Sequence, residues 1–170
     1  QQLTMGDLCL GSQKASLCVK GSQVSAAQGS LEFALNEFDL KRLRPWLPDN
    51  FRWQAVLSAD GRASWRGSQP TLHARVSTTP GTLVADEIKT EYQRLELGVD
   101  FERQQAAIRL DFASRQIGNI DTDLLIKEPA GPGLLSGQLK FDDLKLATFA
   151  PLIPEVRSLQ GFSSADARFD

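Results

Sequence analysis

Few residues in this chain are of the types that perform chemistry. There is one histidine, His73, and there are two cysteines, Cys9 and Cys18. These are too few for a four-ligand zinc site, and they supply no Ser/His/Asp or Cys/His catalytic set. His73 lies between Leu72 and Ala74 on the polar side of an alternating run, so we expect it to be a surface residue.

Two pairs of carboxylates stand close together in the sequence, Asp121 with Asp123 and Asp142 with Asp143. Glycoside hydrolases use paired carboxylates, but in alternating strands such pairs usually face solvent. No glycine-rich phosphate-binding loop is present. We therefore expect no enzyme activity, no cofactor, and no catalytic or metal-binding residues.

The two cysteines flank a predicted turn at Gly11–Lys14. A hairpin folded about the middle of this turn places Cys9 opposite Cys18 and Leu10 opposite Leu17, with the sulfurs on the face away from the leucines. The spacing permits a cross-strand disulfide, but two free thiols on a sheet would fit the pattern as well.

The most informative stretch is Leu31–Pro48, where the period of the apolar residues changes. Its first part alternates between apolar and polar residues, which predicts a strand with one apolar face. Leu40, Leu43 and Leu47 then follow at helical spacing, after a potential N-cap at Asp39. Prolines end this segment and a second alternating run follows. The prediction is strand, short helix, strand.

The same unit occurs again near the end of the chain. A shift of 106 residues, the difference between Pro45 and Pro151, aligns residues 137–170 with residues 31–64. Eight of the 34 aligned pairs are identical, whereas unrelated sequences would give about two. Chance similarity of two amphipathic segments is the alternative. The repeat predicts a second short helix, with Leu146, Phe149 and Ile153 as the counterparts of the first leucine stripe.

Alternating runs continue through most of the remaining chain. We expect about ten to twelve strands, a hairpin turn at Asp60-Gly61, and a bulge or bend near Arg94, where the alternation changes phase. The residues predicted to line one apolar face are Leu31, Phe33, Leu35, Phe51, Trp53, Leu57, Leu72, Val76, Leu95, Leu97, Val99, Phe101, Ile108, Leu110, Phe112, Ile120, Leu124, Ile126, Leu139 and Phe141.

Composition agrees with a folded β protein. The chain has 170 residues, of which 41% are hydrophobic and 24% charged, and its net charge of −2 gives no reason to expect a nucleic-acid partner. No apolar run approaches the ~20 residues of a membrane-spanning helix. We expect one domain over residues 1–170, as a segment of a longer polypeptide. Its apolar face is either a closed sandwich or barrel core, or an open groove that accepts an apolar client.

The segment LEFALNEFDLKRLRPWLP, followed by a strand and repeated near the C-terminus, resembles the AsmA-like repeats of the TamB family. These proteins are inner-membrane-anchored subunits of the bacterial translocation and assembly module. The resemblance implies an all-β fold: a long, curled antiparallel sheet, described as a β-taco, with its apolar side inside, its polar side outside and two short inserted helices.

The resemblance also implies a function and a location. It points to a periplasmic groove that carries or chaperones phospholipid acyl chains or nascent outer-membrane and autotransporter β-strands. The full-length protein would be anchored in the inner membrane and would engage its outer-membrane partner TamA through regions outside this soluble segment. An oxidising periplasm favours the Cys9–Cys18 disulfide. A structural spacer between the machineries of the two membranes, with the apolar face as an ordinary core, is the alternative.

Overall fold

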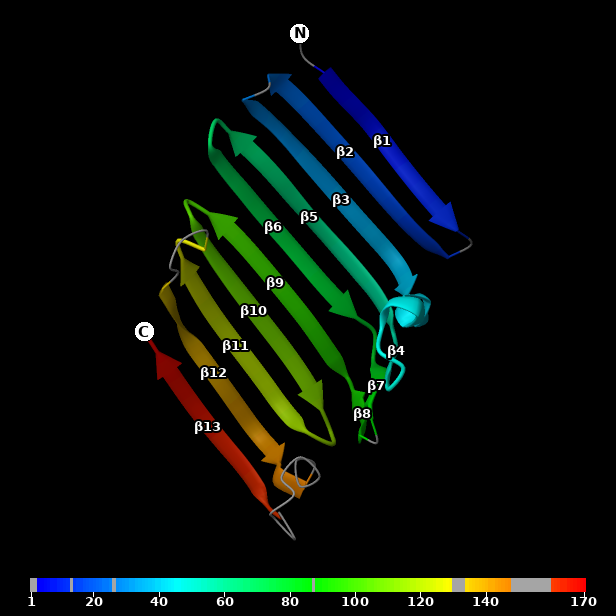
Figure 1. Cartoon of the computed structure of the whole chain (residues 1–170), viewed down its shortest axis with the longest axis vertical. Coiled ribbons are helices and arrows are strands. Elements are labelled where there is room, and N and C mark those ends of the chain that lie inside the picture. The colour runs from blue at the N-terminus through cyan, green and yellow to red at the C-terminus, as the bar shows by residue number, and fades with distance from the viewer. Residues whose placement is uncertain (1–2, 13, 26, 87, 130–133, 148–159) are drawn as a thin grey trace.

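The fold is known from a computed structural model, which describes residues 3–12, 14–25, 27–86, 88–129, 134–147 and 160–170. Over these residues it contains thirteen strands and one short helix, arranged as one large and one small antiparallel sheet (Figure 1). The large sheet has ten strands in the order β1 (Leu3–Ser12), β2 (Ala15–Ser25), β3 (Gln28–Asp39), β5 (Val56–Arg66), β6 (Gln69–Thr78), β9 (Arg94–Glu102), β10 (Gln105–Ser114), β11 (Gly118–Lys127), β12 (Leu134–Lys145) and β13 (Phe162–Phe169).

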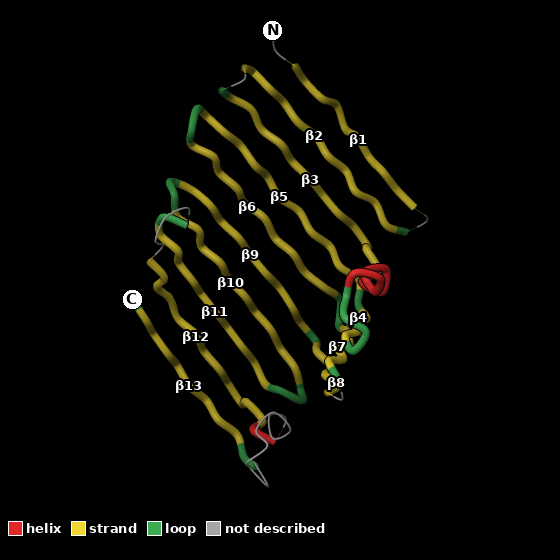
Figure 2. Tube along the Cα trace, in the orientation of Figure 1, coloured by secondary structure: helices red, strands yellow, loops and turns green. Residues whose placement is uncertain are grey.

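The small sheet lies at one end of the central strands of the large sheet (Figure 2). Its order is β4 (Phe51–Gln54), β7 (Gly81–Ala85) and β8 (Ile88–Tyr92). The chain passes from the small sheet to the large one at Ala55 and again at Gln93. The change of phase expected near Arg94 is therefore this passage from β8 to β9.

These features confirm an all-β fold built on one large antiparallel sheet. The sheet is open, because β1 and β13 form its two edges and do not pair with each other. The two inserted helices are not both confirmed. The first is present, but most of the expected second helix falls at residues 148–159, outside the described residues.

The first helix, η1 (Leu40–Trp46), is a 3-10 helix that follows β3 directly. The Asp39 carboxylate accepts a hydrogen bond from the backbone N–H of Lys41 at 3.0 Å, as expected for the N-cap. The helix continues through Pro45 and ends one residue later. Leu40 is 1% exposed, and its backbone N–H donates to the carbonyl of Ala55, so the start of the helix is fixed against the crossing point between the sheets.

Leu40→Ala is expected to lower the free energy of unfolding by about 2–4 kcal/mol, because it removes a fully buried side chain and leaves a cavity. Denaturant unfolding measures the change. Leu43→Ala is the matched control. Because Leu43 is only half-buried, this substitution should lower the free energy of unfolding by less. Equal losses for the two variants would contradict the assignment of Leu40 as the anchor.

Several features of the first unit recur 106 residues later. Glu37 and Asp143 both have positive φ, 51° and 55°, and each marks a bulge just before the end of its strand. The same spacing relates two backbone hydrogen bonds, Leu40 N–H to the Ala55 carbonyl and Leu146 N–H to the Gly161 carbonyl. These local features of the backbone therefore share the 106-residue spacing of the sequence repeat.

The prediction of a hairpin turn at Asp60-Gly61 is wrong. Both residues lie inside β5, and the turn instead follows at Gly67, which has φ +61°. Gly61 pairs with Phe33, and a Cβ on Gly61 would lie 2.6 Å from the Phe33 ring. The glycine therefore makes room for a cross-strand aromatic ring rather than for a turn.

Candidate binding faces of the sheet

Apolar side chains form continuous rows across one face of the ten-stranded sheet. Residues paired directly across antiparallel strands share a face, so the strand register defines each row. One row crosses all ten strands: Leu10, Leu17, Leu35, Ala59, Val76, Leu97, Leu110, Thr122, Leu139 and Ala167. We call this side of the sheet the apolar face.

The structure places the predicted groove residues on this face, with two differences. Phe51 and Trp53 lie on β4 of the small sheet, because the alternating run divides at Ala55. The other predicted residues lie in the apolar rows, and all of them are half-buried.

No second layer covers the middle of the apolar face in the part of the chain that the structure describes. The fully buried apolar side chains there are Leu40 and Tyr92, at 1% and 2% exposure. Exposure rises toward the edges of the sheet, reaching 64% for Leu10 on β1 and 36% for Phe169 on β13. Over the described residues, this is an open apolar surface rather than a closed core.

Tyr92 joins the small sheet to one end of the apolar face. Its hydroxyl accepts hydrogen bonds from Trp53 Nε1 at 2.8 Å and from Thr78 Oγ1 at 3.1 Å. Its ring lies 5.9 Å from the ring of Phe112, measured between centroids. Thr78 and Phe112 lie in one cross-strand row near this end of the apolar face, so the small sheet covers the face there. The sequence pattern did not indicate this role for Tyr92.

The opposite face is charged, and most of the residues that line a hollow of about 1250 Å³ belong to it, although Val76, Leu97 and Leu110 of the apolar rows also contribute to the lining. Near its middle, a Cβ on Gly98 would meet no atom closer than Arg109 Cβ at 3.9 Å, so the sheet surface is open there. Eight carboxylates and four cations besides His73 line it: Asp7, Glu32, Asp60, Glu96, Asp100, Asp111, Asp121 and Asp123, with Lys20, Arg62, Arg75 and Arg109. The expected polarity, with the groove on the apolar side, is therefore not confirmed.

Most charges on this face are arranged in pairs. Arg94 Nε lies 2.7 Å from an oxygen of Asp111, and this hydrogen bond raises the pKa of Arg94. The hydrogen bond to Asp142 likewise raises the pKa of Lys140. His73 Nδ1 lies 2.7 Å from Asp100 Oδ1, on the exposed surface as expected. Such exposed pairs contribute little to stability.

The carboxylates singled out in the sequence do not form a common site. Asp121 and Asp123 are exposed on β11, and Asp123 pairs with Arg109 at 3.4 Å. Asp142 pairs with Lys140, and Asp143 occupies the bulge of β12. Among the described residues, no group of three or more potential metal ligands is found.

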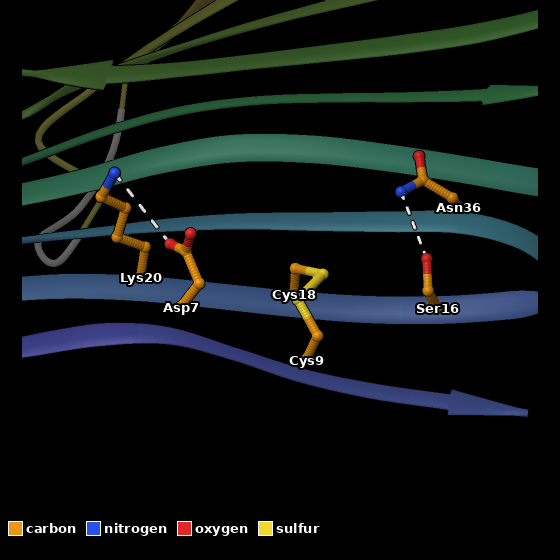
Figure 3. The surroundings of a disulfide bond; sticks show 6 residues. All are labelled: Asp7, Cys9, Ser16, Cys18, Lys20 and Asn36. Atoms are coloured by element: carbon orange, nitrogen blue, oxygen red, sulfur yellow. Dashed lines mark hydrogen bonds and ion pairs between the residues drawn. A yellow bond between two sulfur atoms is a disulfide. The ribbon is translucent and has the colours of Figure 1, made fainter.

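Cys9 and Cys18 form a disulfide between β1 and β2, with their Cα atoms 4.1 Å apart. The register also pairs Leu10 with Leu17, which confirms the expected hairpin. Figure 3 shows the bridge on the same side of the sheet as Lys20, whose ammonium lies 4.0 Å from Asp7. The disulfide therefore lies on the charged face and ties the edge strand to its neighbour.

Protein prepared from an oxidising compartment is expected to show no alkylatable thiol until it is reduced. Mass measurement after alkylation, with and without reductant, tests this. Reduction should lower the free energy of unfolding by about 2–3 kcal/mol, because the closed loop is short. Two thiols that react without reductant would contradict the bridge. A Cys9→Ala/Cys18→Ala variant, which reductant should leave unchanged, is the control.

Comparison with known protein families identifies the family to which the chain belongs. The family model for the TamB N-terminal domain matches residues 1–170, the whole of this sequence. The chain belongs to the TamB family. Membership in the TamB family indicates a role in envelope biogenesis and, in general terms, a partner in envelope assembly. No solved structure matches the chain. Within the described residues, no helix has the length and apolar character needed to cross a membrane.

Proposed function

We propose that the apolar face carries or shields apolar clients during envelope biogenesis. The observation that supports this is the row that crosses all ten strands, apolar at every position except Thr122, without a covering layer in the described part of the chain. Soluble monomers rarely expose a continuous apolar patch of more than a few hundred Å². An apolar client that lies on this face would remove it from water.

The proposed clients are phospholipid acyl chains or nascent outer-membrane and autotransporter β-strands. Both present apolar surface, and the half-buried rows around Leu97 and Leu110 would contact either one. Within this proposal the chain acts in the periplasm as part of a protein anchored in the inner membrane, with TamA as the outer-membrane partner of that protein. The role needs binding and release but no catalysis.

The experiment is native mass spectrometry of the chain purified from an envelope fraction without detergent. Acyl-chain lipids or peptide segments that remain bound to the folded protein would support the proposal. A Leu110→Asp variant should lose the bound material, because an ion on the apolar face lacks a partner once a client covers it. If the wild-type chain is empty and stays empty after incubation with lipid and with a β-strand peptide, the structural-spacer alternative is favoured.

A further inference from the structure

The exposed side of η1 combines three cations with an indole. Lys41, Arg42 and Arg44 are all exposed. Trp46 is 77% exposed, the largest exposed fraction among the large apolar side chains that the structure describes. These four residues are called the η1 tip below.

The cations of the η1 tip lack carboxylate partners. Over the described residues, none of the three lies within ion-pair distance of an Asp or Glu, whereas most charged side chains on the sheet are paired. Arg42 Nη1 donates to Ser12 Oγ at 3.0 Å, and the other two side chains have no described partner. The chain as a whole has a net charge of −2, so these three cations within four residues are opposite in sign to the net charge of the chain.

The backbone holds the η1 tip in a fixed orientation. A 3-10 helix has three residues per turn, so Leu40, Leu43 and Trp46 follow one line along its surface. Along this line the side chains change from buried to half-buried to exposed. The line therefore leads out of the protein interior and ends with the indole in solvent. Lys41 and Arg44 occupy the neighbouring line by the same spacing.

From this arrangement we infer that the η1 tip binds the surface of an anionic phospholipid bilayer. Lipid phosphates supply the negative charge that the unpaired cations lack. An indole fits the boundary between headgroups and acyl chains, where its ring meets apolar material and its N–H stays in a polar region. This surface contact is independent of the proposed function, because it uses none of the residues on the apolar face.

Vesicle co-sedimentation of the chain tests the inference. Phosphatidylcholine vesicles that contain about one-third phosphatidylglycerol are compared with pure phosphatidylcholine vesicles at low and high salt. We expect binding to the anionic vesicles alone, weakened by salt. Lys41→Gln/Arg44→Gln should reduce the partition coefficient roughly twenty-five-fold, since each cation near an anionic surface is worth about five-fold. The matched control is Arg66→Gln/Arg115→Gln, which removes the same charge from exposed positions elsewhere and should leave binding unchanged.

The contribution of the indole needs its own variant. Trp46→Ala should weaken binding by roughly ten-fold, because partial burial of the ring is lost. Lipids brominated near the headgroup should quench the fluorescence of Trp46, and Trp46→Phe should remove this quenching. Equal binding to neutral and anionic vesicles, no binding to either, or equal losses for the tip and control variants would each overturn the inference.

Discussion

Leu97→Arg is expected to abolish the proposed carrier function of the full-length protein, while Glu96→Arg leaves that function close to wild type. The two positions are neighbours in β9 and receive the same new side chain, but they lie on opposite faces of the sheet. Leu97 lies in the row that crosses all ten strands, paired with Val76 and Leu110. Glu96 lies in the neighbouring row on the charged face, paired with Ser77 and Asp111.

The physical reason is the cost of covering a charge. The apolar face is open, so a guanidinium at position 97 stays hydrated while the face is empty. A client that covers it must remove that water without supplying a partner, which costs several kcal/mol. About 3 kcal/mol already corresponds to more than a hundredfold loss in binding.

Outer-membrane integrity, measured as resistance of cells to detergent, is the readout for the full-length variants. Circular dichroism and thermal unfolding of the isolated chain must first show that both variants fold. If folded Leu97→Arg protein supports integrity as well as Glu96→Arg protein, the apolar face is not a path for clients. The spacer alternative would then replace the carrier proposal.

Tyr92→Ala is expected to lower the free energy of unfolding by about 3–5 kcal/mol, the range for large buried aromatic side chains. Tyr92 is 2% exposed and lies on the small sheet; its ring contacts Phe112 and its hydroxyl accepts a hydrogen bond from Thr78, both on the large sheet. Its loss therefore removes packing and one hydrogen-bonded connection between the sheets. Denaturant unfolding gives the magnitude.

Tyr92→Phe separates the two contributions. It keeps the ring and removes the acceptor for Trp53 Nε1 and Thr78 Oγ1, so the expected loss is about 1–3 kcal/mol. A loss below about half a kcal/mol for Tyr92→Ala is typical of surface positions, and it would show that the small sheet is not fixed to the apolar face through this residue.

The sequence predicts the faces of the large sheet well, because alternation is a local property. Each strand between β9 and β11 shows its two sides directly in the order of its residues. The N-cap at Asp39 and the pairing of Cys9 with Cys18 were also predictable, since both depend on neighbours within a few residues or across one short turn.

Pairing between distant segments could not be predicted in the same way. Alternation continues without a break from Phe51 to Leu57, yet the chain leaves one sheet and enters the other at Ala55. That division depends on the pairing of β4 with β7, about thirty residues away, which no local pattern specifies. Asp60-Gly61 was misleading for a similar reason, because the ring that occupies the space beside Gly61 comes from Phe33 on another strand.

The hollow on the charged face illustrates another limit. The sequence identifies which side chains are polar. The shape of a sheet, however, follows from its twist and from the positions at which small residues leave space above the strands. Gly98 creates open space between charged neighbours, and its effect depends on the register with β10. A pattern of apolar and polar residues therefore assigns the faces without showing which one is hollowed.

The repeat of 106 residues also sets a length along the direction in which strands are added. β3 and β12 begin equivalent units, and six steps in the order of the large sheet separate them. At roughly 4.8 Å per step, one unit lengthens the sheet by about 29 Å. Because six is even, the equivalent strands of an antiparallel sheet run in the same direction and present their apolar side chains on the same face. Each added unit in such a polypeptide would therefore lengthen the apolar face by the same distance. The bulges equivalent to those at Glu37 and Asp143 would lie along the same side of the sheet in every unit.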